Sequence, residues 1–251
     1  MTRILVTNDD GIEAEGLAKL AEALTPLGEV TVVAPAEEKS AVGHGLTIRN
    51  PLQLQQKDDR WFSVSGTPTD CVNVAVSEVL GGVPDLVVAG INAGLNVGDD
   101  VTYSGTVAGA LEGVLHGALG LAVSQQRQTP LLDYAAAGGV AQRLAEAVLA
   151  QGLPRRTLLN VNVPRGKPLG VRVTVQARRS QWFSTTQIFD QRRETEVWVR
   201  SAELEWERDE RSDYDAIQAG WVSVTPLHAD WTNHAALAQV ELAVASFAEV
   251  R

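Results

Sequence analysis

The sequence predicts an α/β fold with a mostly parallel sheet flanked by helices. Its first apolar run, residues 4–6, is followed by a stretch in which Leu17, Leu20 and Leu24 recur at helical spacing. A strand followed by a helix opens an α/β unit. Farther along, residues 84–91 form a near-continuous apolar run, which is typical of a strand buried on both faces of a parallel sheet.

The first strand ends in a pair of carboxylates, Asp9 and Asp10, followed by Gly11. Ligands of open α/β sheets bind outside the carboxyl ends of the strands. Oxygen ligands suit hard divalent cations such as Mg²⁺, Mn²⁺ or Ca²⁺, so the pair predicts a metal site. The alternative is a hairpin turn, for which Asp-Gly is a strong signal. A helical pattern follows where the partner strand would be, which disfavours that alternative.

A second strand is predicted at residues 30–34, followed by a loop at residues 36–45. The loop leaves the carboxyl end of a strand, so it should lie on the same rim as the two carboxylates. Ser40 offers that rim a hydroxyl for a metal or a phosphate, but its spacing alone favours a solvated hydroxyl or a helix cap. His44 lies in the same loop, and a lone histidine is more often structural than catalytic.

Two short strands are predicted at residues 46–49 and 61–64, around a polar turn. A helix then begins with Thr67 as N-cap, Pro68 at the first helical position and Asp70 at the third position of a capping box. Capping alone is a sufficient role for these three residues.

The strand at residues 84–91 ends in Asn92 and a loop rich in glycine and short polar side chains. Asn92 follows a strand end directly, as Asp9 does. Its neutral amide oxygen is a type of ligand that cations accept. Asn and Gly also serve turn geometry, and this stretch alone favours neither role.

Ser104, Gly105 and Thr106 begin a helix of small residues. Free backbone amides, two hydroxyls and the helix dipole would meet there, which predicts an anion site. An ordinary Ser or Thr cap is the alternative. The anion site is favoured because it would share one rim with the cation site.

The remaining elements are expected as strand, helix, strand, hairpin, helix, strand and helix. They are assigned to residues 121–124, 132–149, 158–163, 171–175 paired with 195–199, 215–220, 221–227 and 233–248. The polar, aromatic and basic stretch between the hairpin arms suits a subunit contact, a folded flap or the rim of a cleft. Asp230 and His234 are expected to pair at the start of the last helix.

Composition limits the partners and the compartment. The 251 residues have a net charge of -10, which argues against a nucleic-acid polymer or an anionic membrane as a partner. A small phosphorylated substrate remains possible, because a bound metal reverses the local field. Cys71 is the single cysteine, and no leader or membrane-spanning stretch is visible, so a cytoplasmic location is expected.

Motifs of several other chemistries are missing from the sequence. There is no Gly-Lys-Ser/Thr phosphate loop, no Gly-x-Gly-x-x-Gly after the first strand, no Gly-x-Ser-x-Gly elbow and no second cysteine for zinc. The strand-end carboxylates, amide and hydroxyls suit metal-assisted hydrolysis of a phosphate ester.

Five motifs in this order resemble the survival protein SurE family of metal-dependent nucleoside 5′/3′-monophosphate phosphatases. They are Thr7-Asn8-Asp9-Asp10-Gly11, Gly66-Thr67-Pro68-Thr69-Asp70, Asn92-Ala93-Gly94-Leu95-Asn96, Tyr103-Ser104-Gly105-Thr106 and Val222-Ser223-Val224-Thr225-Pro226-Leu227. The resemblance implies one domain over 1–251. A Rossmann-like core would occupy 1–165, and an extended β-hairpin, the last core strand and a swapped C-terminal arm would occupy 166–251. It also implies homodimers or tetramers.

The resemblance implies roles for individual residues, with one divalent metal ion per subunit. The metal ligands would be Asp9, Asp10, Ser40 and Asn92. The residues around the phosphate would be Asn8, Asn96, Ser104, Gly105 and Thr106, with Asn8 also counted as catalytic beside Asp9 and Asp10. His44 is a further hypothesis for a substrate contact or proton donor. The chain departs from many members in having Gly43-His44-Gly45 where they carry serines, which puts an extra hydroxyl contact in doubt.

The function predicted is hydrolysis of nucleoside 5′- and 3′-monophosphates to nucleoside and phosphate. Attack by a carboxylate is disfavoured, because Asp-Asp-Gly lacks the Asp-x-Asp spacing and the metal requires both groups. Two alternatives stay open: a phosphatase that prefers inorganic polyphosphate, and a non-catalytic, metal-dependent nucleotide-binding regulatory protein.

Overall fold

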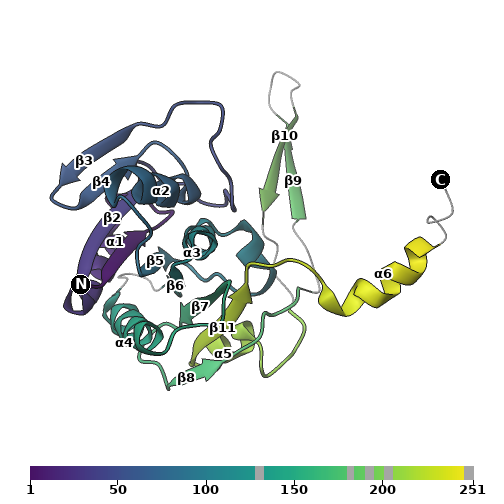
Figure 1. Ribbon diagram of the computed structural model, residues 1–251. Helices are drawn as coiled ribbons and strands as arrows, with labels where there is room; N and C mark the ends of the chain where they lie inside the picture. The colour runs from purple at the N-terminus through teal and green to yellow at the C-terminus, as the bar shows by residue number, and fades with distance from the viewer. Residues whose placement is uncertain (128–132, 180–183, 190–194, 201–205, 246–251) are drawn as a thin grey trace.

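The computed structural model of the protein describes residues 1–127, 133–179, 184–189, 195–200 and 206–245. Nine strands form one sheet in the order β3-β4-β2-β1-β5-β6-β7-β11-β8, and β9 and β10 form a separate hairpin (Figure 1). The strands are β1 (Arg3–Thr7), β2 (Glu29–Pro35), β3 (Leu54–Asp58), β4 (Trp61–Val64), β5 (Leu86–Ala93), β6 (Leu119–Gln125), β7 (Thr157–Val163), β8 (Val171–Val173), β9 (Ser184–Phe189), β10 (Thr195–Arg200) and β11 (Val222–His228).

The six central strands are parallel, which confirms the predicted sheet. β1 lies between β2 and β5, with Val6 beside Val32 and Val88. The strands β4, β6 and β7 extend the parallel sheet on either side, whereas β3 and β11 pair in the antiparallel direction. The carboxyl ends of β1, β2 and β5 therefore share one rim, as the sequence predicts.

Helices cover both faces of the sheet, because the side chains of a strand alternate between its two faces. Ile4 and Val6 pack with α1 and α4, whereas Leu5 packs with α2 on the other face. In Figure 1, α2 and α3 lie on one side of the central strands and α1 and α4 on the other. The helices are α1 (Glu15–Leu24), α2 (Pro68–Val74), α3 (Gly105–His116), α4 (Ala135–Gln151), α5 (Asp213–Gln218) and α6 (Leu237–Val244). Shorter turns of other helix types are η1 (Thr25–Leu27), η2 (Ala75–Val79), η3 (Gly98–Tyr103) and η4 (His234–Ala236).

The capping box at the start of α2 is confirmed. The Asp70 amide donates to the Thr67 hydroxyl oxygen at 3.2 Å, and the Thr67 amide donates to the Asp70 carboxylate at 2.9 Å. Pro68 is the first helical residue. The other carboxylate oxygen accepts from the Thr47 amide at 2.9 Å, which also ties the preceding irregular segment to this turn.

Two strand pairings differ from the prediction. Residues 46–49 form no strand, and the antiparallel partner of β4 is β3, because a short turn joins adjacent segments directly. All five residues of β3 are exposed, so this edge strand has no apolar alternation to reveal it. Residues 171–175 are not a hairpin arm: β8 pairs in parallel with β11, and the partner of β10 is β9.

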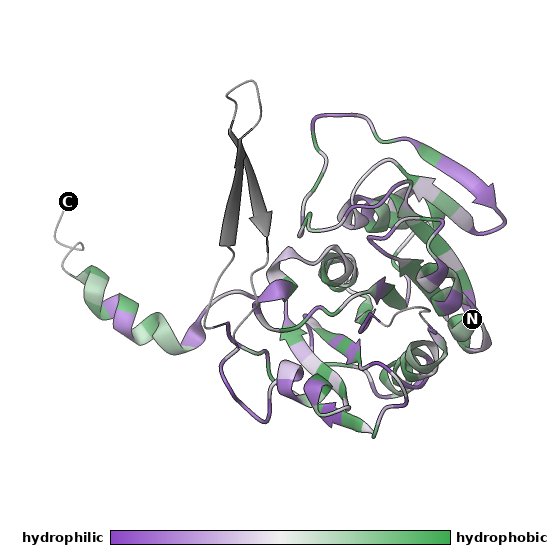
Figure 2. Ribbon diagram, turned by 180° about the vertical axis from the view of Figure 1, so that it is seen from behind, coloured by the Kyte–Doolittle hydropathy of each residue, from purple (hydrophilic) through white to green (hydrophobic). Residues whose placement is uncertain are grey.

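The C-terminal segment leaves the body of the molecule, with α6 running outward in Figures 1 and 2. Leu237, Val240, Leu242 and Val244 of α6 are all exposed. The expected pairing of Asp230 and His234 is present at 3.1 Å. Exchange of this arm between subunits stays a prediction. In the described residues, no helix is long and apolar enough to cross a membrane.

Candidate active site at the carboxyl ends of the parallel strands

Asp9 and Asp10 join three elements at the rim of the sheet. Asp9 is 5% exposed, and its Oδ1 accepts a 2.6 Å hydrogen bond from the Thr106 hydroxyl at the start of α3. The Asp10 carboxylate accepts from the Ala93 amide at the end of β5 at 3.2 Å. The carbonyl of Asp9 accepts from the Lys39 amide at 2.7 Å, which brings the loop after β2 to the same place.

The surroundings of the two carboxylates raise the pKa of both. Burial raises the pKa of Asp9 to about 6; the Thr106 hydrogen bond opposes this shift, and the charge of Asp10 adds to it. Burial also raises the pKa of Asp10, the Ala93 amide opposes the rise, Glu38 adds to it, and Arg127 lowers it. A buried pair of like charges is stabilised when a bound cation compensates both.

Asn8 closes the turn that carries the two carboxylates, and its implied catalytic role stays a prediction. It is fully buried, and its side-chain amide donates to the Gly11 carbonyl at 2.8 Å while its oxygen accepts from the Gly11 amide at 3.2 Å. Both bonds close the turn that carries Asp9 and Asp10, and Gly11 has the positive φ of 100° that this turn requires. In this geometry Asn8 shapes the acidic turn.

Asn92 and Ser40 lie on the same rim, and they differ in which of their side-chain atoms already form hydrogen bonds. The Asn92 amide nitrogen donates to the Gly94 carbonyl at 2.9 Å, so its oxygen is the atom left for a cation. The Ser40 hydroxyl donates to Glu38 at 2.7 Å and must rotate to face the carboxylates. In the described ranges, no group of three or more His, Cys, Asp or Glu side chains is placed to hold a metal ion. A metal here would therefore need these neutral oxygens.

The N-terminus of α3 lies directly against Asp9. Ser104 is the N-cap and accepts from the Val107 amide at 3.0 Å. A Cβ on Gly105 would lie 2.8 Å from the Asp9 Cβ, so only glycine allows this approach. The Thr106 hydroxyl is already donated to Asp9. The Thr106 backbone amide also hydrogen-bonds to Asp9 and lowers its pKa. The anion donors that remain are the amide of Gly105 and the Ser104 hydroxyl.

Asn96 is held on all sides by other strands. Its backbone amide donates to the Asn162 Oδ1 at 2.8 Å, and its carbonyl accepts from the side-chain amides of Asn160 and Asn162 at 2.8 and 2.9 Å. Its own side-chain amide donates to the Ser124 hydroxyl at 2.8 Å. A side-chain amide has two N–H groups, so the second is left for a substrate oxygen.

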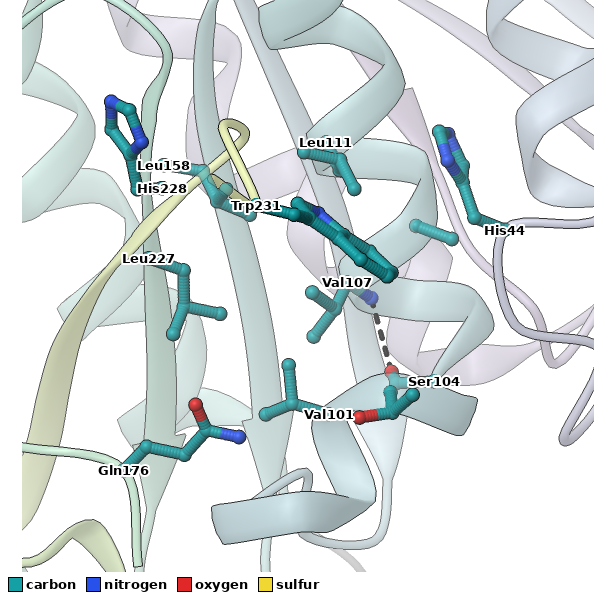
Figure 3. Close-up of a pocket in the computed structure, with 12 residues that line it drawn as sticks. His44, Val101, Ser104, Val107, Leu111, Leu158, Gln176, Leu227, His228 and Trp231 are labelled. Carbon is teal, nitrogen blue, oxygen red and sulfur yellow. Dashed lines mark hydrogen bonds between the residues drawn. The ribbon is translucent and has the colours of Figure 1, made fainter. Parts of the chain in front are cut away.

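A cavity of about 360 Å³ opens beside Ser104, at the start of α3 (Figure 3). It is lined by His44, Val101, Thr102, Ser104, Val107, Ala108, Leu111, Leu158, Gln176, Leu227, His228 and Trp231. His44 and His228 lie on opposite sides of the cavity in Figure 3. The Nε2 of His44 lies 2.7 Å from the Glu112 carboxylate, so the loop after β2 is tied to α3.

Four residues that contact the loop after β5 belong to none of the motifs identified in the sequence: Asn160, Asn162, Gln176 and Asp213. The alternation Asn160-Val161-Asn162 places two asparagines on one face of a buried strand, and this is a sequence signal that a polar partner is required. Asp213 has no comparable signal, because an acidic residue in the first turn of a helix is common. The contacts of Gln176 and Asp213 with the loop after β5 come only from the folded chain.

The fold and the rim define a Rossmann-like α/β protein with an acidic strand-end site facing a helix N-terminus. The family model described as "Survival protein SurE" matches residues 4–182. The protein of Geobacter metallireducens named 5′-nucleotidase SurE is 46% identical over 239 residues, covering 94% of each chain. The one of Pelobacter propionicus is 48% identical over 237 residues, with 93% of this chain and 96% of that chain covered.

A solved structure, that of the SurE protein from Aquifex aeolicus, superposes with a TM-score of 0.86 at 38% sequence identity. The superposition covers 96% of this chain and 99% of that one. The chain belongs to the survival protein SurE family.

Proposed function

We propose that this protein is a metal-dependent phosphatase that hydrolyses nucleoside 5′- and 3′-monophosphates to nucleoside and phosphate. The observation that supports this most directly is the contact between Asp9 and the start of α3, through the Thr106 hydroxyl at 2.6 Å. It places a carboxylate suited to a cation next to the N-terminus of α3, whose first amide and N-cap hydroxyl can donate to an anion, and a phosphate ester needs both. The names of the related proteins point to the same reaction.

One divalent cation would be held by Asp9, Asp10 and Asn92, with Ser40 as a fourth ligand after its hydroxyl turns from Glu38. The fit rests on two adjacent carboxylates whose pKa values are both raised by burial, next to an amide oxygen. When bound, the ion supplies positive charge that offsets the charge of the phosphate and of the transition state.

The protein's own groups would bind the phosphate and orient the reactants. The amide of Gly105, the Ser104 hydroxyl and the second N–H of Asn96 would be donors for the equatorial oxygens. Asp10 is less buried than Asp9 and would accept a hydrogen bond from the attacking water. His44 is our candidate for the proton donor to the leaving oxygen, because it lines the cavity on the side of Ser104.

The cavity beside Ser104 supports a nucleoside as the leaving group. Its walls are mainly apolar, with Trp231, Leu111 and Leu227 among them. A flat aromatic ring is suited to stack on a base, and apolar walls with few polar groups are typical of small-molecule sites. A polyphosphate chain would instead require cationic side chains, and among the described residues no Lys or Arg lines the cavity. This disfavours the polyphosphate alternative.

The test is phosphate release from a panel of nucleoside 5′- and 3′-monophosphates, p-nitrophenyl phosphate and a polyphosphate length series, with Mg²⁺, Mn²⁺ or EDTA. We expect turnover that EDTA abolishes and that favours the nucleotides. Equal rates on p-nitrophenyl phosphate would remove the role of the cavity. Nucleotide binding by calorimetry without turnover in any metal would support the regulatory alternative instead.

We propose in addition that the protein forms a homodimer or tetramer through the outward α6 arm, whose four large apolar side chains are exposed. Sedimentation of the full chain should give a dimer or tetramer mass, and deletion of residues 233–251 should reduce it. A monomeric full chain would contradict this assembly.

A further inference from the structure

Among the described residues outside the acidic rim, Asp213 is the most deeply buried carboxylate. The proposed mechanism does not use it. It begins α5, is 0% exposed, and accepts three backbone hydrogen bonds. Its Oδ2 accepts from the Gly98 amide at 2.9 Å, and its Oδ1 accepts from the amides of Ala177 and Tyr214 at 3.0 and 2.8 Å. Burial raises its pKa, although these three bonds oppose the rise. A carboxylate kept in such a place is expected to have a specific partner.

The partner of interest is Gly98, which lies two residues after Asn96. The backbone N–H and C=O of Gly98 are both bound from outside the loop. The N–H donates to Asp213, and the carbonyl accepts from the Gln176 side-chain amide at 2.8 Å. A Cβ on Gly98 would lie 2.1 Å from the Trp206 ring and 2.7 Å from the Ala177 carbonyl, so the peptide is enclosed as well. Trp206 in turn stacks on Tyr214, the residue after Asp213, with ring centroids 4.9 Å apart.

These contacts hold Gly98 in place within the loop that runs from β5 to α3. The near end is held at Asn96 by Asn160 and Asn162. The turn η3 (Gly98–Tyr103) then leads directly into Ser104, the N-cap of α3. Gly98 is therefore a fixed point of the loop between Asn96 and Ser104.

We propose that Asp213 is a positioning residue for phosphate binding, which acts by holding Gly98 so that Asn96 and Ser104 face the phosphate. The inference rests on the proposed function, since these two residues are phosphate contacts only there. Asp9, Asp10 and Asn92 lie on strand ends outside this loop, so we expect a loss of Asp213 to change the affinity for phosphate much more than the affinity for the metal.

Asp213→Asn is a selective test, because the amide is the same size but has one oxygen. If that oxygen keeps the two bonds to Ala177 and Tyr214, the new NH₂ group faces the Gly98 amide, and two donors oppose each other. We expect the dissociation constant of the Mn²⁺-loaded full chain for inorganic phosphate to rise about tenfold, the loss expected when one buried hydrogen bond is removed. The KM for a nucleoside monophosphate should rise similarly, and the Kd for Mn²⁺ should stay within about twofold.

The matched control is Asp215→Asn in the same helix, whose carboxylate accepts from the Asp209 amide. It should bind phosphate and Mn²⁺ as the wild type does. Gln176→Leu is the second variant, and it should weaken inorganic phosphate binding in the same direction by about threefold, because a weaker, more exposed bond to Gly98 is lost. Inorganic phosphate has no nucleoside, so this measurement ignores the contact of Gln176 with the cavity.

The outcomes separate the two proposals. Phosphate affinity unchanged in folded Asp213→Asn, or in Gln176→Leu if the first variant does not fold, would overturn the positioning role while leaving the nucleotidase intact. A parallel fall of phosphate affinity, Mn²⁺ affinity and Tm would also overturn it, since that pattern marks a purely structural carboxylate. If the wild type binds phosphate without hydrolysing nucleotides, the proposed turnover fails and the positioning role is still decided by phosphate affinity. A wild type that binds no phosphate would overturn both.

Discussion

The two sides of the site are held together in different ways. The acidic side is built on neighbouring parallel strands: Asp9 and Asp10 follow β1, and Asn92 lies in the adjacent β5. The loop that carries Asn96 lies outside these strands and is held by side chains of β7 and α5, through its bonds to Asn162 and Asp213. The pairing of β1 with β5 brings the acidic side together, whereas the loop depends on polar side chains from the later part of the chain. Substitutions should therefore separate metal binding from phosphate binding.

The largest effect is expected on the acidic side, for Asp9→Asn. The variant should lose metal-dependent turnover by at least about a hundredfold, because the ion supplies several kcal/mol of transition-state stabilisation. It should keep its fold, since a carboxylate whose pKa burial raises is costly to keep charged. Mn²⁺-dependent rates and circular dichroism measure the two properties. Glu13→Gln, an exposed carboxylate in the same turn, is the control, and a fully active Asp9→Asn protein would remove Asp9 from the site.

The next effect is at the junction of the two sides, for Gly105→Ala. The added Cβ would lie 2.8 Å from the Asp9 Cβ and 3.0 Å from its Oδ2, so either α3 or Asp9 must shift. We expect turnover to fall at least about tenfold and the free energy of unfolding to fall by about 1–3 kcal/mol.

Gly139→Ala is the matched control, because a Cβ there meets nothing within 4 Å in the described residues. It should keep full activity and gain up to about 1 kcal/mol of stability, since alanine is favoured over glycine in a helix. Equal activity of the two variants would show that the contact between α3 and Asp9 is not needed.

On the loop side, Asn162→Ala should reduce stability and phosphate binding together. The fully buried side chain makes two of the bonds to Asn96, and its loss leaves the Asn96 backbone amide without a partner, while the carbonyl keeps its bond from Asn160. We expect the free energy of unfolding to fall by about 2 kcal/mol and the KM for nucleotide to rise several-fold, while the Kd for Mn²⁺ stays constant. Urea unfolding and steady-state kinetics are the measurements. Asn233→Ala at an exposed site is the control and should change stability by less than about 0.5 kcal/mol. A lower Mn²⁺ affinity in Asn162→Ala would contradict the separation of the two sides.

The smallest effect concerns the hydrogen bond between His44, in the loop after β2, and Glu112 of α3. Burial raises the pKa of Glu112, but hydrogen bonds from His44 and Asn73 outweigh it and lower the pKa overall. A lowered pKa contributes stability above the ordinary Glu value of about 4.3, and this contribution is lost as the pH falls through the lower folded value. Glu112→Gln should therefore cost less than about 1 kcal/mol at pH 7.

The difference in urea midpoint between Glu112→Gln and the wild type should shrink as the pH falls from about 5 to about 3, because the contribution is lost below the ordinary Glu pKa of about 4.3. A difference that stays constant over this range would assign the effect to packing of the side chain. Lys19→Gln, which removes an exposed pair with Glu22, is a control for surface charge and should show almost no difference.

Much of the acidic side could be predicted because each of its determinants is local. The run at residues 4–6, the Asp9–Asp10 turn and Asn92 lie at strand ends, and parallel strands place their ends on one rim. The capping box at Thr67 and the N-cap at Ser104 are equally local, and both are confirmed. Pattern alone could not show that Ser40 would face Glu38 or that Asn8 would close its own turn, because side-chain rotamers respond to their neighbours.

The wrong pairings have a common cause. Residues 46–49 and 171–175 alternate as strands do, but alternation states which residues share a face and not which strand is the neighbour. The exposed strand β3 pairs with β4 because a short turn joins the two. The strand β8 pairs with β11, which follows about 50 residues later.

The sequence by itself determined the order of the parallel core elements, the acidic strand end and the helix cap that faces it, because hydrophobic period, capping and strand-end placement act over a few residues. Only the tertiary structure decided that Thr106 binds Asp9, that Gly98 is enclosed by Trp206, and that Asp213 and Asn162 hold the loop. Those contacts join buried polar groups far apart in the chain. Each polar group must find a partner once it is buried, but which partner it finds depends on how the whole chain packs.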